Sequence, residues 1–444
     1  MKIPVAAVTL LVLVALPLFA AEDAGSKDRT RQALLYGIDS QVLDAIASIK
    51  AAQDQDFTKE LVQILSEQRS EDVQMAVFDL FKEQKIRDGE EYAKKALAGW
   101  QDLKSGLVIS AVQYLSAISS AGLAAALTPL VDASENALAS AAIQALGSSG
   151  DSSAATLLVA KLKNPDFQDA RKNDVILALG NLKDPSAVDE LLAIARSQDE
   201  DKVRRMYAAD SLGKIGDSRA LPVLRGMFAE NDALIRLYAA SALSRFGLDE
   251  VFPSLVQGLR DENVKVREQS ANALARALNA SQAQTALPIL SYKAKLDPEP
   301  SVRLASIQAL GAIGGDEAMK VLLTLYGSSD YPLASREAAL GILAVQALPA
   351  SLETIRSVIS TEWTSFDARV LESTAKVLST IKSTELKDLY VRFLESKDAV
   401  VRSYGVRGIA VNGFSDLKQK VKQIADQDPN PGTRTEAAAS YAKL

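Results

Sequence analysis

Along most of this chain, apolar and polar residues follow a sequence motif, here called the phrase, that recurs about every 33 residues. Each phrase contains a basic residue, then mixed small and apolar residues, then Leu-Gly or a close equivalent. The large apolar residue of each phrase is its marker, and the markers are Leu115, Leu146, Leu179, Leu212, Leu243, Leu274, Leu310, Leu343, Leu378, Ile409 and Tyr441. Successive markers are 31 to 36 residues apart. A period in this range is typical of stacked helical repeats, in which no unit buries its apolar face alone.

The unit at residues 202–231 shows the pattern within one repeat. Its first half predicts a helix, because four apolar residues recur at helical spacing: Ala208, Ala209, Leu212 and Ile215. Gly216 is expected to end this helix, since Gly adopts the left-handed conformation at little cost. Asp217 is placed to accept hydrogen bonds from the free N–H groups that open the next helix. The second half, up to Phe228, predicts the antiparallel partner helix.

The N-terminus predicts export. Lys2 precedes an apolar run from Val5 to Leu16, and small residues follow at Ala20 and Ala21. This order is typical of a secretory signal peptide, here assigned to residues 1–21, and an uncleaved membrane anchor is the alternative. Residues 22–102 then form an N-terminal helical region of degenerate repeats or a cap, and residues 103–444 form the repeat array with a C-terminal half-repeat as a lid. We expect a periplasmic or secreted protein with no integral membrane segment in the mature chain.

The composition of the chain limits the partners, active sites and metal sites that it can have. Lys plus Arg number 50 against 56 Asp plus Glu, and the basic residues are not clustered, which argues against a nucleic-acid partner. The chain has no Cys, so packing alone must hold an exported fold together. It also has no His, which excludes Ser-His-Asp catalysis and zinc sites built on imidazole. No phosphate-binding glycine string is present, and we expect no cofactor and no metal.

The phrase resembles HEAT repeats, specifically the short bacterial kind described as phycobilisome-lyase-like. Val302-Arg303 with Ala309-Leu310-Gly311 and Ile313-Gly314 matches that family's phrase well, and Val266-Arg267 with Ala273-Leu274 matches it in part. The resemblance covers residues 103–444 and implies an all-α fold, an α-solenoid of stacked antiparallel helix pairs. Lyase-like HEAT proteins attach or detach bilin chromophores. We do not expect that activity here, because an exported protein would not meet cytoplasmic or plastid antenna proteins.

An arginine stands seven residues before the marker in most units. These residues form a predicted ladder along the stack: Arg205, Arg236, Arg267, Arg303, Arg336, Arg402 and Arg434. An acid lies six residues before most of them, at Asp199, Glu230, Asp261, Asp297, Asp330 and Asp428. One interpretation is a stripe that binds anions. The other, which the resemblance to HEAT repeats favours, is that these Asp and Arg residues tie adjacent units together.

The function that follows from these features is a non-enzymatic scaffold of the cell envelope that binds an extended protein partner along a concave groove. We expect the second helix of each unit to line that groove. The candidate contact residues, chosen for polarity and aromaticity, are Arg219, Arg225, Gln257, Arg260, Tyr292, Lys293, Lys320, Thr324 and Tyr326. The alternative is an envelope enzyme or a chaperone-like maturation factor, for which converging carboxylates in a deep pocket would be the sign.

Overall fold

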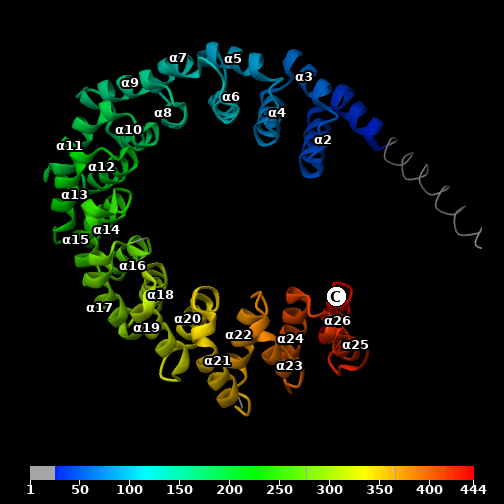
Figure 1. Ribbon diagram of the computed structural model, residues 1–444. Helices are drawn as coiled ribbons and strands as arrows, with labels where there is room; N and C mark the ends of the chain where they lie inside the picture. The colour runs from blue at the N-terminus through cyan, green and yellow to red at the C-terminus, as the bar shows by residue number, and fades with distance from the viewer. Residues whose placement is uncertain (1–25, 277, 366) are drawn as a thin grey trace, which may run out of the picture. The chain divides into compact units, whose positions relative to one another are not determined.

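Helices are the only regular secondary structure in the described part of the chain. The computed structural model describes residues 26–276, 278–365 and 367–444, so the predicted signal peptide lies outside it. The all-α solenoid predicted from the repeat phrase is confirmed (Figure 1). The chain divides into two compact units between Val223 and Leu224. Within the described residues, no helix combines the length and the apolar character needed to cross a bilayer.

The first unit begins with a helix at residues 26–36. The helices that follow are α2 (Asp39–Ala52), α3 (Thr58–Ser66), α4 (Glu71–Gln84), α5 (Glu90–Ala98), η2 (Trp100–Asp102), α6 (Ser105–Ala117), α7 (Leu123–Leu127), η3 (Thr128–Asp132), α8 (Asn136–Gly147), α9 (Ser152–Lys163), α10 (Asp169–Leu182), η4 (Pro185–Ala187), α11 (Val188–Arg196), α12 (Lys202–Ile215) and η5 (Ser218–Ala220). Because α4 packs on α6, helical stacking extends to the N-terminal side of residue 103.

The second unit continues the same order after α13 (Leu221–Phe228), which spans the division. Its helices are α14 (Ala233–Leu243), α15 (Leu248–Gly258), α16 (Val264–Leu274), α17 (Ala280–Leu296), α18 (Pro300–Ile313), α19 (Gly315–Gly327), α20 (Leu333–Gln346), α21 (Leu348–Glu362), α22 (Arg369–Leu378), η6 (Thr384–Leu386), α23 (Lys387–Leu394), α24 (Ala399–Asn412), η7 (Ser415–Leu417), α25 (Lys418–Gln427) and α26 (Pro431–Tyr441). The marker residues fall in the even-numbered helices α6 to α26, which we call the marker helices. The odd-numbered helices α7 to α25 are the second helices.

Local sequence sets the boundaries of these helices as predicted. Gly216 ends α12 in the left-handed conformation with φ of 76°. The Asp217 carboxylate then accepts the Arg219 N–H and starts η5, which leads into α13. Several marker helices also begin at an acidic or amide cap, and Asp201 at α12 and Asn263 at α16 each accept two N–H groups of the first turn. Such caps fix the point at which each repeat re-enters a helix.

The two helix layers are the reverse of the expected arrangement. Within each unit taken by itself, the marker helices lie on the inner side of the curve and the second helices on the outer side (Figure 1). The expectation that second helices line the concave side is therefore wrong. The physical reason is the small side chains of the marker helices, which let neighbouring repeats approach closely. A Cβ added at Gly147 would lie 2.7 Å from the Cα of Ala178, and one at Gly180 would lie 2.7 Å from the Cα of Ser211.

The closest helix pairs also differ from the pairs expected within one sequence repeat, in which a marker helix is followed by its own second helix. Most second helices pack most closely on the marker helix that follows, as α17 does on α18 and α25 does on α26. The connection inside such a pair is short, and only residues 297–299 separate α17 from α18. That short loop is where the arginine ladder meets the acids.

Candidate interaction surface

Three arginines of the predicted ladder each form a two-pronged ion pair with the acid of the next repeat. The pairs are Arg236 with Asp261, Arg267 with Asp297, and Arg402 with Asp428. In the second pair, Nε of Arg267 donates to Oδ2 of Asp297 at 2.9 Å and Nη2 donates to Oδ1 at 3.0 Å. We call this arrangement the clamp. It joins one marker helix to the loop at the start of the next marker helix.

The same arginine also holds the loop that precedes its own helix. Nη1 of Arg267 donates to the carbonyl oxygens of Asp261 and Glu262, at 2.9 and 3.0 Å. The carboxylate is equally occupied, because Oδ1 of Asp297 accepts the Glu299 N–H and Oδ2 accepts Lys293 Nζ. A planar guanidinium with five donors suits this combination of carboxylate and carbonyl acceptors. Each clamp thereby connects two loops and two repeats.

Burial makes these pairs different from surface ion pairs. Asp297 is only 2% exposed and Arg267 only 7%. Burial acts to raise the pKa of Asp297, but hydrogen bonds from Arg267 and Lys293 outweigh it and hold that pKa below its ordinary value. The pKa of Asp428 is also lowered, chiefly by its hydrogen bond from Arg402. Both carboxylates are therefore held in the ionised form by the clamp.

The other ladder arginines depart from this geometry. Arg205 and Arg336 donate Nε to the carbonyl oxygens of Ala195 and Tyr326. Nη1 of Arg303 donates to the carbonyl oxygens of Asp297 and Pro298 in the usual way. Its Nε, however, has no hydrogen-bond partner among the described residues. The ladder thus holds three clamps, and we call Arg303 the open clamp because its Nε lacks a partner. Arg434 likewise bonds the preceding loop through Nη1.

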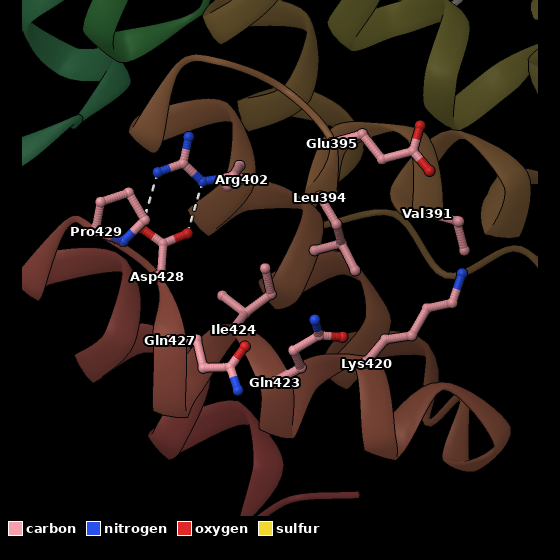
Figure 2. A pocket seen from close by; sticks show the side chains of 10 residues that line it. All are labelled: Val391, Leu394, Glu395, Arg402, Lys420, Gln423, Ile424, Gln427, Asp428 and Pro429. Atoms are coloured by element: carbon pink, nitrogen blue, oxygen red, sulfur yellow. Dashed lines mark hydrogen bonds and ion pairs between the residues drawn. The ribbon is translucent and has the colours of Figure 1, made fainter.

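Hollows lie beside two of the clamps, at equivalent places in the repeat. One, of about 520 Å³, lies between α23 and α25 and is lined by Leu394, Lys420 and Gln427 together with the clamp of Arg402 and Asp428 (Figure 2). The other, of about 610 Å³, lies beside the clamp of Arg236. Both hollows are shallow surface features of the second-helix layer. At the clamp of Arg267 the equivalent position is occupied by Lys293, which bonds Asp297 at 3.0 Å.

The candidate contact residues have different local environments in the structure. Gln257 and Arg260 line the hollow beside Arg236, and Tyr292 is 58% exposed on α17. The others have local partners: Arg219 with Asp217 and Asp189, Arg225 with the Glu250 carbonyl, Lys293 with Asp297, Lys320 with Glu317, and Thr324 with the Lys320 carbonyl. These residues are carried by the outer layer.

Tyr326 cannot serve as a contact residue, which corrects its selection. The side chain is 1% exposed, and its hydroxyl lies 3.1 Å from Oγ1 of Thr374. Burial raises the pKa of its phenol. The helical spacing held the signal, because Tyr326 follows the buried Leu322 by four residues and so shares its apolar face.

Sequence reasoning missed the exposed apolar side chains of the second unit. Leu234, Val345 and Val400 are 46%, 74% and 45% exposed on α14, α20 and α24, and Leu296 is 61% exposed at the end of α17. Three of these four lie on marker helices, in the inner layer. Within the described residues, no group of three or more carboxylates is arranged to hold a metal ion.

Comparison with known proteins places this architecture in a family. The sequence pattern described as Spirochaete HEAT repeat protein matches residues 34–441. The chain belongs to this family. The phycobilisome-lyase-like detail of the expected resemblance has no such support. A comparison with curated protein sequences finds no match.

Solved structures share the HEAT solenoid fold at low sequence identity. Importin beta is 15% identical with a TM-score of 0.55, over 93% of this chain and 66% of that one. Kap121p bound to Ste12p is 13% identical with a TM-score of 0.51, over 93% of this chain and 52% of that one. The chain therefore covers less than two thirds of the length of either structure. At these identities the likeness concerns the fold.

Arg267→Ala should lower the free energy of unfolding by about 3 kcal/mol, because its removal takes two donors from a buried carboxylate and leaves two loop carbonyls without their donor. Thermal melting of the variant measures the loss. Lys265→Ala is the matched control, since Lys265 is exposed on the same helix and forms a surface ion pair with Glu268. An unchanged melting temperature for Arg267→Ala, together with lost partner binding, would assign the ladder to function instead of stability.

The clamps also predict how stability depends on pH. The folded pKa of Asp428 is lowered, so its contribution is complete above the ordinary Asp pKa of about 3.9 and is lost as the pH falls through the folded value. Asp428→Asn should therefore be less stable than the wild type at pH 7, and the difference should shrink below about pH 4. Melting temperatures measured from pH 7 to pH 2 for both proteins test this. A difference that stays constant over the range would contradict it.

Proposed function

We propose that this HEAT repeat protein is a non-enzymatic scaffold of the cell envelope that binds an extended protein partner along the inner, marker-helix layer. The proposal rests on the composition and repetition of this layer. It repeats the same helix along each unit and leaves apolar side chains such as Leu234 and Val345 exposed. Exposed apolar groups on a repeated surface are suited to many shallow contacts with one extended chain.

The solved structures add support of a general kind. Kap121p, whose fold this chain shares, has been solved bound to Ste12p and to the extreme C-terminus of the protein phosphatase Cdc14p. A solenoid that binds partner proteins is thus a known use of this architecture. The clamps favour the scaffold over the enzyme alternative, because the buried charged groups of each clamp are already paired with one another.

A photo-cross-linking residue placed at Val345 should capture a partner in the intact envelope, because this side chain is 74% exposed on the inner layer. The matched control is the same residue at Glu353, which is exposed on α21 of the outer layer. We expect one distinct cross-linked protein at Val345 and none at Glu353. Equal labelling at both positions, or none at either, would contradict the proposed surface.

Export is the second part of the proposal. Cleavage after Ala20 or Ala21 would leave a mature chain that begins at Ala21 or Glu22 and is recovered without detergent. N-terminal sequencing of the protein from the envelope fraction measures this directly. Retention of Met1 in a membrane pellet would favour the uncleaved anchor instead.

A further inference from the structure

In each of the three clamps, a backbone N–H two residues further along the chain orients the acid. The carboxylate accepts this bond through Oδ1, and the pairs are Asp261 with Asn263, Asp297 with Glu299, and Asp428 with Asn430, at 2.8, 3.1 and 2.9 Å. The donors are the N-cap residues of α16, α18 and α26. Oδ2 of the same carboxylate is then free to accept Nε of the clamp arginine.

The acid at the open clamp lacks this N–H. Asp330 lies three residues before α20, as Asp297 lies three residues before α18, but the residue two further along is Pro332. Proline has no backbone N–H to orient the carboxylate. Ser328 provides a local partner instead, because its hydroxyl donates to Oδ2 of Asp330 at 3.0 Å and accepts the Asp330 N–H at 3.2 Å. Asp330 is therefore exposed, and Nε of Arg303 is buried without a partner.

The junction at the open clamp also lacks other polar side-chain links. Within the described residues, no side-chain hydrogen bond or ion pair joins residues 280–313, which hold α17 and α18, to residues 315–346, which hold α19 and α20. The other junctions between consecutive marker helices of the second unit each have such a link, which is formed by Arg236 and Asp261, Arg267 and Asp297, Lys376 and Glu337, Asn412 and the Ile381 carbonyl, and Arg402 and Asp428.

Helix packing at this junction is also easier to deform. A Cβ added at Gly311 of α18 would meet side-chain atoms of Ile342 on α20, of which Cδ1 is the nearest at 2.8 Å. At the equivalent glycines, Gly147 and Gly180, the added Cβ would lie 2.7 Å from a Cα atom of the next marker helix. The end of an isoleucine side chain can change rotamer, whereas a backbone atom moves only with its helix. The contact between α18 and α20 therefore yields more readily.

We propose that Ser328 and Pro332 hold the clamp of Arg303 open, so that the junction between α18 and α20 is a compliant joint within the second unit. The clamped repeats before the joint then move relative to the repeats after it, in a small hinge motion. Closure of the clamp by Asp330 would restrict this motion. The buried Nε of Arg303 favours closure, because an unsatisfied buried donor is destabilising. The joint is a property of the fold and does not depend on the proposed partner.

Thermal stability tests whether Asp330 can close the clamp. The closing variant, Ser328→Ala with Pro332→Ala, removes the local partner and restores the N–H. Adding Asp330→Asn to the closing variant should lower its melting temperature by about 3 °C or more, because a buried ion pair is broken. In the wild type, Asp330→Asn should lower it by less than about 1 °C, because Asp330 is exposed there. Comparing the two backgrounds cancels the effect of the proline on the unfolded chain.

Spin labels on the full mature chain test the compliance. Because the chain has no Cys, two introduced cysteines carry the only labels. The test pair is Asn272→Cys with Gln346→Cys, at exposed positions of α16 and α20. The control pair is Leu234→Cys with Gln308→Cys, at exposed positions of α14 and α18 that are separated by two clamped junctions. Pulsed electron paramagnetic resonance should give a broader distance distribution for the test pair.

The closing variant should narrow the distribution of the test pair to the width of the control pair and leave the control pair unchanged. Equal effects of Asp330→Asn in the two backgrounds would show that Asp330 does not close the clamp and would overturn the inference. Equal widths for the two label pairs in the wild type, or a test pair that the closing variant does not narrow, would also overturn it. These measurements are separate from the cross-linking at Val345, so the joint and the proposed scaffold can fail independently.

Discussion

The clamp between an arginine and the acid of the next repeat is the interaction that ties consecutive repeats together at three places in the second unit. Short loops between helices leave carbonyl oxygens that cannot pair within a helix, and such groups need a donor when they are buried. Arg267 supplies that donor to one loop and reaches the next loop through Asp297. One side chain therefore fixes the separation of two repeats and the direction of both connections.

Close packing of the marker helices is the second constraint, and it acts together with the clamp. Gly180 lies so near Ser211 that any larger side chain would collide with it, and the Ser211 hydroxyl bonds the Ile176 carbonyl across the same contact at 2.8 Å. The second helices carry larger side chains, such as Met227 and Phe228, and these hold their layer further apart. A stack with one narrow and one wide layer must bend toward the narrow one.

The sequence alone predicted the helices and their ends well, because those depend on neighbouring residues. The marker spacing places Leu212 in a buried helix face, and Gly216 and Asp217 determine where α12 ends and η5 begins. The layer that faces inward could not be predicted in this way, since it depends on the width of two packed layers. The burial of Tyr326 against Thr374 depends on a helix 48 residues away, although its spacing from Leu322 gave a partial signal.

The open clamp at Arg303 shows that the repeated sequence motif does not predict which arginine pairs with the acid of the next repeat. Arg267 and Arg303 have similar local sequences, since each follows a valine. Each also has an acid at the equivalent position of the next repeat, Asp297 for Arg267 and Asp330 for Arg303. Asp297 turns inward to its arginine, whereas Asp330 turns outward to Ser328. The local alternative of a serine hydroxyl two residues away decides between them, because short polar side chains readily bond within their own loop. A ladder arginine therefore lacks its carboxylate partner where the acid of the next repeat bonds within its own loop.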